Sequence, residues 1–184
     1  MSTDLQTSRL LLRRWTDEDL PAFARLNADP QVMEHFPKQL DRSESDAVAA
    51  RILAHFDERG FGLWAVSVRG GDPFIGFVGL NVPAFQAPFT PCVEIGWRLA
   101  REHWGHGYAS EAARAALAFG FNELQLAEIV SFTVPANVRS RSVMERIGMR
   151  HSPADDFLHP MLPAGHPLQP HVFYRLPRAE WAAP

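Results

Sequence analysis

The stretch that decides the fold runs from Val93 to Phe121 and reads V-E-I-G-W-R-L-A-R-E-H-W-G-H-G-Y-A-S-E-A-A-R-A-A-L-A-F-G-F. In its first part, 93–99, apolar side chains alternate with other residues, which is the periodicity of a strand. Gly105 and Gly107 follow, and glycine permits a positive φ and a close approach of the backbone to a ligand. From Tyr108 onward, small residues recur at helical spacing. The stretch therefore predicts a strand, a glycine turn and a helix.

A helix that begins directly after a glycine turn offers a binding site for an anion. The free N–H groups of its first turn point outward, and the helix dipole favours negative charge there. Two common phosphate-binding motifs do not match. The motif G-x-x-x-x-G-K-[ST] lacks its lysine, because Tyr108 follows Gly107. The motif G-x-G-x-x-G is incomplete, because Ser110 stands in place of its third glycine.

A third type of phosphate loop fits better. The segment W-G-H-G-Y-A-S-E-A (104–112) resembles the acetyl-CoA pyrophosphate loop of the GNAT N-acetyltransferase superfamily. The opening S-R-L-L-L-R-R-W-T-D-E-D-L (8–20) and the late N-V-R-S-R-S-V-M-E-R-I-G-M (137–149) resemble the same family in its order and spacing. Within the family, the chain looks like the RimJ/RimL-like branch of ribosomal-protein N-terminal acetyltransferases, which also contains antibiotic and small-amine acetyltransferases. One departure is Glu102, where the family often has Gln or Arg, and we expect its side chain to face solvent.

The resemblance implies one N-acetyltransferase domain over residues 1–184. The implied α/β fold has a mixed central sheet of about seven strands with helices on both faces, splayed at the central parallel strands. A proline-rich segment, 152–170, is expected to form a long ordered loop that covers part of the domain. The periodicity predicts strands near 10–15, 61–69, 74–82, 93–99, 128–135 and 171–176, and helices near 16–27, 43–60, 108–121 and 140–147.

Composition narrows the class of protein. The chain of 184 residues has a formal net charge of −3, which gives no electrostatic case for nucleic-acid binding. No apolar run approaches the roughly 20 residues that span a membrane, and the N-terminus lacks the apolar core of a signal peptide. Cys92 is the only cysteine, so no internal disulfide can form. These features predict a cytoplasmic protein in a reducing compartment.

The resemblance implies acetyl-CoA as the cosubstrate. In the family, the backbone of the central strand grips the pantetheine arm and polarises the thioester carbonyl. The glycine loop binds the pyrophosphate, and an asparagine after the fifth predicted strand contacts the pantetheine. The residues that correspond to these roles are Trp97, Arg98 and Leu99 on the strand, Gly105, His106, Gly107, Tyr108 and Ala109 in the loop, and Asn137.

Acetyl transfer to an amine requires a base for the amine proton and an acid for the departing thiolate. Glu94 is the candidate base, because it lies near where the family often places a basic glutamate; a purely structural glutamate is the alternative. Met144 replaces the tyrosine that many members use as the acid. Ser140, or a water, is therefore the candidate acid, and its alternative is a first-turn residue that satisfies backbone donors. Glu111 matches a family glutamate, for which we expect a structural role.

The acceptor amine is the open point. An α-amine with a pKa near 7.7–8 demands less of a base than a lysine amine near 10.4. The lack of an obvious strong base therefore favours a protein or peptide N-terminal α-amine, with small amines and aminoglycosides as alternatives. A non-catalytic acyl-CoA-binding module and a nucleotide-binding regulator are the alternative classes of function. The resemblance also makes a homodimer plausible.

Two further groups of side chains have a functional and a structural interpretation. Four aromatic residues could line the acceptor pocket or belong to the core, namely Phe36, Phe56, Phe61 and Trp64. The late histidines and acids could suggest a metal, but their spacing matches no compact ligand motif, and no metal site is predicted. These are His159, His166, His171, Asp155 and Asp156.

Overall fold

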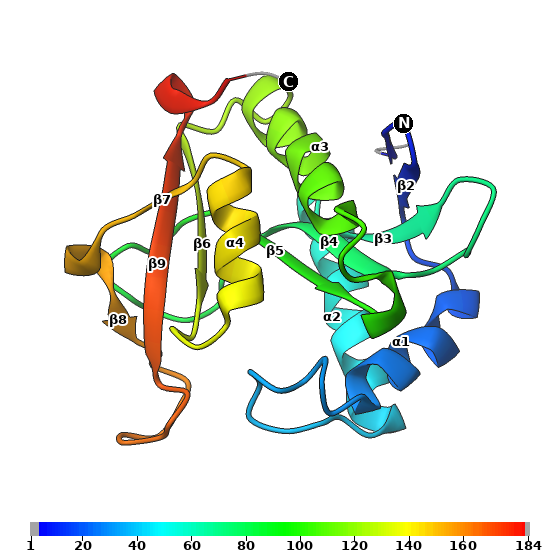
Figure 1. Ribbon diagram of the computed structural model, residues 1–184, viewed down its shortest axis with the longest axis horizontal. Helices are drawn as coiled ribbons and strands as arrows, with labels where there is room; N and C mark the ends of the chain where they lie inside the picture. Colours follow the sequence, from blue (N-terminus) through cyan, green and yellow to red (C-terminus); the bar gives the residue numbers. More distant parts are fainter. Residues whose placement is uncertain (1–3, 183–184) are drawn as a thin grey trace.

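One mixed sheet runs through the computed structural model, which describes residues 4–182 (Figure 1). Within these residues nine strands pair in the order β1-β2-β3-β4-β5-β6-β9-β7, and β8 pairs with β9. The strands are β1 (Leu5–Gln6), β2 (Leu10–Arg13), β3 (Leu63–Val68), β4 (Gly76–Asn81), β5 (Glu94–Leu99), β6 (Glu128–Thr133), β7 (Arg150–His151), β8 (Phe157–Leu158) and β9 (Pro170–Pro177). The α/β fold is as predicted. The strand number exceeds the expected seven or so because β1, β7 and β8 have two residues each, too few for a periodicity to show.

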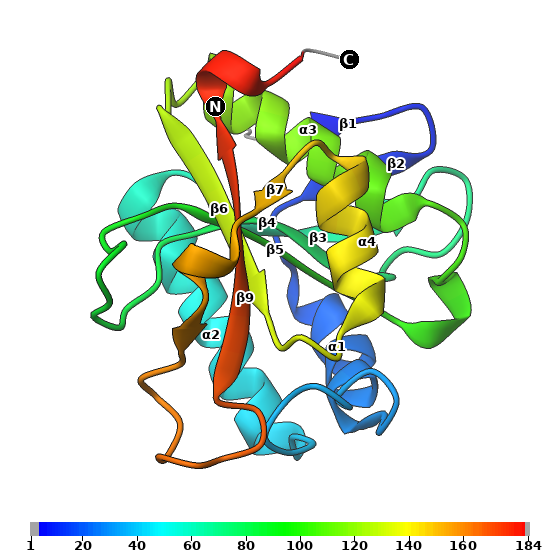
Figure 2. The ribbon, with the colours of Figure 1, turned by 60° about the vertical axis from the view of Figure 1, so that its left-hand side comes forward.

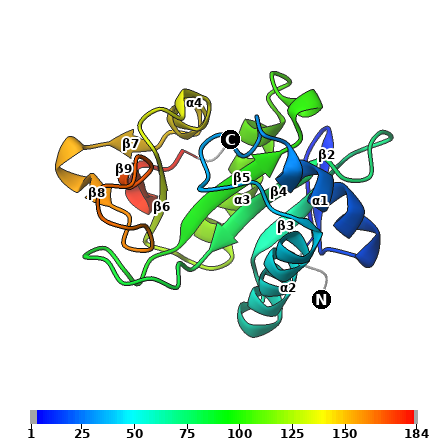
Figure 3. The same ribbon diagram turned by 90° about the horizontal axis from the view of Figure 1, so that it is seen from below.

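Helices cover both faces of the sheet, as expected. They are α1 (Leu20–Ala28), α2 (Arg42–Arg59), α3 (Tyr108–Asn122) and α4 (Val138–Arg146). Figure 1 shows α3 and α4 in front of the sheet and α2 behind it. Figure 3 shows α1 and α2 side by side, on the opposite side of the sheet from α4. Each face of the sheet thus buries its apolar side chains against two helices.

Two helices begin earlier than the periodicity predicts, because polar residues cap them. The Asp41 side chain accepts a hydrogen bond from the Glu44 backbone N–H at 2.8 Å, and α2 starts at Arg42. The Asn137 side chain accepts one from the Ser140 backbone N–H at 3.2 Å, and α4 starts at Val138. Side-chain caps of this kind satisfy the N–H groups that the first helical turn leaves free.

β5 links two well-paired halves of the sheet. It is antiparallel to β4 over its whole length, from Gly76↔Leu99 to Asn81↔Glu94. Its parallel pairing with β6 consists of the single pair Glu94↔Val130, and Figure 1 shows the two strands running apart from there. A last contact comes from the buried Ser131 hydroxyl, which donates to the Ile95 carbonyl at 2.8 Å. Beyond Ile95 the sheet is open, which is the predicted splay.

An aromatic cluster holds the proline-rich segment 152–170 in place. Phe157 lies 4.8 Å from Phe89 and 5.4 Å from Phe132 between ring centroids, and Phe85 lies 4.7 Å from His159. Figure 2 shows this segment, in orange, on the same side of the molecule as the loop between β4 and β5. The segment is therefore the ordered covering loop that the composition predicts, and its short strand β8 pairs with β9.

Two glycines that face each other across β4 and β5 allow a matched test of the packing. A Cβ on Gly79 would lie 2.2 Å from the Gly62 carbonyl oxygen and 2.7 Å from the Trp64 ring, whereas a Cβ on Gly96 would find only Glu94 Oε1 at 4.0 Å. We expect Gly79→Ala to lower the free energy of unfolding by about 1–3 kcal/mol. Gly96→Ala should change it by about 0.5 kcal/mol or less. Urea denaturation measures both, and an equal loss in the two variants would contradict this account.

Candidate active site

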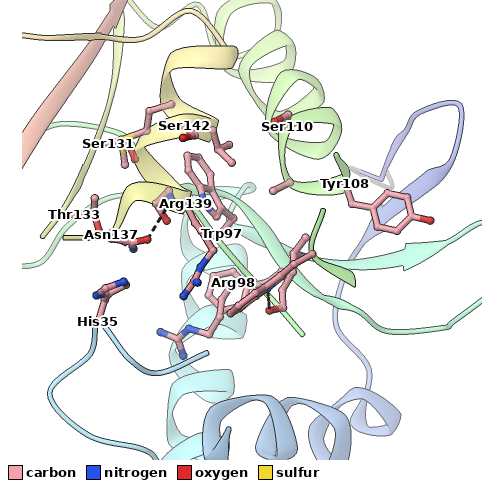
Figure 4. Close-up of a pocket in the computed structure, with 18 of the residues that line it drawn as sticks. His35, Trp97, Arg98, Tyr108, Ser110, Ser131, Thr133, Asn137, Arg139 and Ser142 are labelled. Atoms are coloured by element: carbon pink, nitrogen blue, oxygen red, sulfur yellow. Dashed lines mark hydrogen bonds between the residues drawn. The ribbon is translucent and has the colours of Figure 1, made fainter. Parts of the chain in front are cut away.

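A cavity of about 1610 Å³ opens where β5 and β6 separate (Figure 4). Its walls come from β5, β6, α4, the loop before α3 and the segment between α1 and α2. Ten of the eleven residues predicted to act in the site line it, namely Glu94, Trp97, Arg98, Leu99, Gly105, Gly107, Tyr108, Ala109, Asn137 and Ser140. The folded chain thus brings two segments, 94–109 and 137–140, to one cavity.

His106 is the predicted residue that does not line the cavity. Its ring stacks on Tyr108 with 5.5 Å between centroids, and its carbonyl accepts a hydrogen bond from Arg9 Nη1 at 3.0 Å. The exposed His106 side chain therefore helps to shape the loop from outside.

The backbone of β5 presents unpaired groups to the opening. The carbonyls of Val93 and Ile95 both face β6, since they accept from Val130 N–H and the Ser131 hydroxyl. Backbone groups alternate in direction along a strand, so those of Trp97 point the same way, into the gap. The next carbonyl on this side, that of Leu99, accepts from the indole N–H of Trp104 at 2.8 Å.

The glycine loop has the geometry of an anion site. Gly105 and Gly107 have φ values of 78° and 80°, which non-glycine residues rarely adopt. Gly107 is the N-cap of α3 and has no side chain to occupy the helix end. The N-terminal dipole and free N–H groups of α3 therefore open directly onto the cavity.

Glu111, in the first turn of α3, ties the N-terminal segment to this loop. It accepts hydrogen bonds from the Thr7 hydroxyl at 2.5 Å, the Arg9 N–H at 3.0 Å and Arg9 Nε at 2.7 Å. Burial opposes ionisation, but the bonds from Thr7 and Arg9 outweigh it and lower the pKa of Glu111. The structural role predicted for Glu111 agrees with these contacts. They also hold the Arg9 guanidinium over the Tyr108 ring, 4.8 Å from its centroid.

Glu94 is an acid in an apolar environment. Its side chain borders the cavity, opposite Asn81 in the β4–β5 register. Burial raises the pKa of Glu94 to about 8, and a hydrogen bond with the Asn81 side chain works against this rise. The ionised form of such a carboxyl group is a stronger base than the carboxylate of an exposed glutamate, and its population grows as the pH rises toward 8.

The Arg98 side chain is the part of the site that sequence reasoning missed, because the family resemblance assigned a role only to its backbone. Its Nη1 donates to the Asn27 side-chain oxygen at 2.6 Å. The guanidinium carbon lies 4.1 Å from the Phe36 ring centroid and 5.5 Å from that of Phe77. Burial lowers the pKa of Arg98 to about 10, and its Nε is buried without a hydrogen-bond partner among residues 4–182. The same-face spacing of residues 94, 96 and 98 was the available signal.

The four aromatic candidates divide clearly. Phe56, Phe61 and Trp64 lie in the hydrophobic core, whereas Phe36 lines the cavity and is 38% exposed. Phe36 belongs to the segment between α1 and α2, which also supplies His35 (Figure 4). Sequence spacing did not separate the core aromatics from the lining one.

α4 closes the cavity on the other side. The Asn137 amide donates to the Thr133 hydroxyl at 3.0 Å and its oxygen caps α4, so its orientation is fixed. Arg139 donates to Glu34 at 2.8 Å and lies over the Trp104 ring at 4.5 Å, linking α4 to the segment between α1 and α2. Met144 is 1% exposed and packs in the core.

Residues 4–182 offer neither a metal site nor a membrane span. That part of the chain contains no group of three or more His, Cys, Asp and Glu side chains arranged to hold a metal ion. It also contains no helix long and apolar enough to cross a membrane. Cys92 lies outside the cavity lining, and burial raises the pKa of its thiol to about 11, which leaves it protonated and unreactive at neutral pH.

The family described as the acetyltransferase (GNAT) domain matches residues 9–150. The chain belongs to the GNAT acetyltransferases. A Bacillus subtilis protein named uncharacterized protein YkkB is 36% identical over 156 residues, which are 82% of this acetyltransferase and 87% of that protein. The FsC-acetyl coenzyme A-N(2)-transacetylase of Aspergillus fumigatus is 31% identical, and the match covers 96% of this chain and 77% of that protein. A crystal structure of an acetyltransferase from Agrobacterium tumefaciens has a TM-score of 0.76 at 31% identity, and the match covers 96% of this chain and 95% of that one.

Membership of this family establishes the general reaction. The acetyltransferase moves an acetyl group from acetyl-CoA to an amine. It is therefore an acetyl-CoA-dependent N-acetyltransferase, and the open sheet, the glycine loop and the cavity supply the framework that this reaction needs.

The raised pKa of Glu94 makes a prediction about stability. Between the ordinary carboxyl pKa and about 8, the folded state keeps a proton that the unfolded state has released, so the free energy of unfolding falls as pH rises through this range. Glu94→Gln removes this loss. We expect its melting temperature, relative to wild type, to be similar at pH 5 and clearly higher at pH 9.

Differential scanning calorimetry across pH 5–9 measures this trend. The control is Glu123→Gln, which changes an exposed acid at the end of α3, outside the cavity lining. The same upward trend in both variants would show that it does not originate at Glu94.

Proposed function

We propose that this acetyltransferase modifies an α-amine, with a protein or peptide N-terminus favoured, by direct attack on acetyl-CoA in a ternary complex. The observation that carries the proposal is the position of Glu94. Its carboxyl group, with a pKa of about 8, borders the cavity at the last residue where β5 and β6 are paired. A thioester in the gap would therefore lie within reach of an amine that Glu94 deprotonates.

The gap supplies the binding groups for the cofactor in this proposal. The unpaired backbone of Trp97 would hydrogen-bond the pantetheine and the thioester carbonyl, beside Arg98 and Leu99 on the same strand. The loop from Gly105 to Ala109, at the N-terminus of α3, would bind the pyrophosphate. The Arg9 guanidinium supplies N–H donors beside this loop, since its Nη2 would lie 3.6 Å from a Cβ at Gly107, while its charge is balanced by the ion pair with Glu111.

The pKa of Glu94 supports an α-amine as the acceptor. An α-amine has a pKa near 7.7–8 and a lysine amine one near 10.4. A base with a pKa of about 8 is matched to the first and falls more than two units short of the second. A proton transfer between matched groups costs little free energy.

The departing thiolate requires less help. A thiol of pKa about 8.5 is already a good leaving group near neutral pH. Met144, buried in the core, has no proton to donate. Ser140 lines the cavity at the start of α4, so it or a water molecule is the proposed donor.

A small-molecule amine is the second candidate acceptor. The Aspergillus fumigatus relative is named as a transacetylase of FsC at N(2), and it is 31% identical over 96% of this chain. The RimJ/RimL-like resemblance of the opening and late segments supports the peptide acceptor instead. A homodimer stays a prediction from the resemblance.

The test is a thiol-release assay with acetyl-CoA against peptides with free Ser, Ala or Met N-termini, free amino acids, polyamines and aminoglycosides. At pH 7.5 we expect Glu94→Gln to lower kcat on the preferred acceptor by about 100-fold or more, because removing a general base costs that much. Ser140→Ala should lower it by about tenfold or less, since the thiolate leaves readily.

Two measurements keep this test interpretable. Isothermal titration calorimetry with CoA should give wild-type affinity for both variants, and Glu123→Gln should keep wild-type turnover. Full activity of Glu94→Gln on the preferred amine would refute its role as the base. A preference for polyamines or aminoglycosides over every α-amine would refute the proposed acceptor class.

A further inference from the structure

We propose that the acceptor carries a carboxylate close to its amine, and that the Arg98 side chain binds this carboxylate. The inference rests on the proposed function, since it concerns the acceptor side of the same cavity. The acetyl-transfer reaction alone does not specify the acceptor, and a carboxylate contact with Arg98 would select it.

Arg98 has charge and donors that the protein leaves unused. No Asp or Glu side chain among residues 4–182 forms an ion pair with it. The acids on the segment between α1 and α2 are engaged elsewhere: Asp29 pairs with Arg101 at 3.8 Å, Glu34 pairs with Arg139 at 2.8 Å, and Asp41 caps α2. A buried charge without a counter-ion is costly, so its retention in a cavity wall indicates an anionic ligand.

The orientation of the guanidinium leaves the appropriate edge free. Nη1 is held by the Asn27 oxygen at 2.6 Å, and Asn27 in turn donates to the buried Ser45 hydroxyl at 2.8 Å. Phe36 and Phe77 lie against the guanidinium. The edge formed by Nε and Nη2 remains, and this is the edge that binds a carboxylate with two parallel hydrogen bonds. Nε itself is buried, so a neighbouring side chain has to shift before a carboxylate reaches both atoms, and the partly exposed Phe36, 4.1 Å from the guanidinium carbon, is the side chain we expect to move.

The spacing along β5 places an amine and a carboxylate together. Glu94, Gly96 and Arg98 lie on one face of the strand, because side chains alternate. A Cβ at Gly96 would meet nothing closer than Glu94 Oε1 at 4.0 Å, so open space lies between the acid and the arginine. Residues two apart on a strand are separated by about 7 Å. An amine above Gly96 would therefore contact Glu94 while a carboxylate a few bonds away reaches Arg98.

This anion site is separate from the proposed phosphate site. Arg98 contacts Asn27 at the end of α1 and Phe36 beyond it, on the face of the sheet that α1 and α2 cover. The glycine loop leads into α3, on the opposite face (Figure 1). Figure 4 shows Arg98 directed toward the α1–α2 side and Tyr108 lying away from it at the start of α3. The phosphates of the cofactor would thus not neutralise Arg98.

Two kinds of acceptor provide a carboxylate next to an amine. One is a free amino acid, with its α-carboxylate. The other is a peptide whose second or third residue is acidic. The experiment therefore uses matched pairs that differ only in charge: serine and serine amide, and the peptides Ser-Asp-Ala-Ala-amide and Ser-Asn-Ala-Ala-amide.

Binding of each acceptor to the CoA complex is measured by calorimetry, and turnover with acetyl-CoA by thiol release. Wild type should prefer the carboxylate member of at least one pair by about 10- to 100-fold, the range expected for a charged hydrogen-bonded pair. Arg98→Gln should abolish the preference and leave CoA affinity unchanged, and Arg98→Lys should keep part of it. Arg51→Gln, which changes an exposed arginine of α2 outside the cavity lining, is the control and should behave as wild type.

The two readouts distinguish the two proposals. Equal binding of both members of every pair by wild type overturns the carboxylate inference, whether or not acetyl transfer occurs. A carboxylate preference that depends on Arg98, without turnover on any α-amine, supports the inference and refutes the proposed α-amine transfer. A loss of CoA affinity in Arg98→Gln and Arg98→Lys, with both variants folded by circular dichroism, would assign the side chain to the cofactor and also overturn it.

Discussion

The separation of β5 from β6 is the constraint on which the rest of the structure depends. Two parallel strands meet at Glu94↔Val130 and then part, which leaves backbone groups of Trp97 without a strand partner. Unpaired backbone groups are tolerated only where a ligand or water can satisfy them. The strands on either side are fully paired, β5 with β4 and β6 with β9. The gap between β5 and β6 is therefore part of the folded structure, and the cavity opens at it.

The central stretch could be predicted because its signals are local. Alternation gives β5, the positive φ of Gly105 and Gly107 gives the turn, and the small residues give α3. The two-residue strand β8 could not be predicted, because two residues are too few to show alternation and its pairing with β9 depends on residues later in the chain. The early start of α4 depends on how Asn137 uses its side chain, which spacing alone does not reveal.

The residues of the site also fall into those with a local sequence signal and those placed by distant contacts. Its glycine loop and central strand carry family motifs, so their residues could be named from the sequence. The environment of Arg98 could not, because Asn27 and Phe36 approach from more than 60 residues away in sequence. For the same reason Phe36 was indistinguishable from Phe56 until the fold placed one at the cavity and the other in the core.

β5 can serve both proposed substrates because its backbone groups and its side chains point in perpendicular directions. In the plane of the sheet, the backbone of Trp97 faces the gap, where the cofactor is proposed to lie. Out of the plane, Glu94 and Arg98 face the side of α1 and α2. Burial shifts the pKa values of these two side chains in opposite directions, raising that of Glu94 and lowering that of Arg98. In each case desolvation favours the neutral form. With a pKa of about 10, Arg98 keeps its charge at neutral pH, and a bound carboxylate would raise that pKa again. Selection of the acceptor and tuning of the base therefore both depend on the burial of side chains on one face of β5.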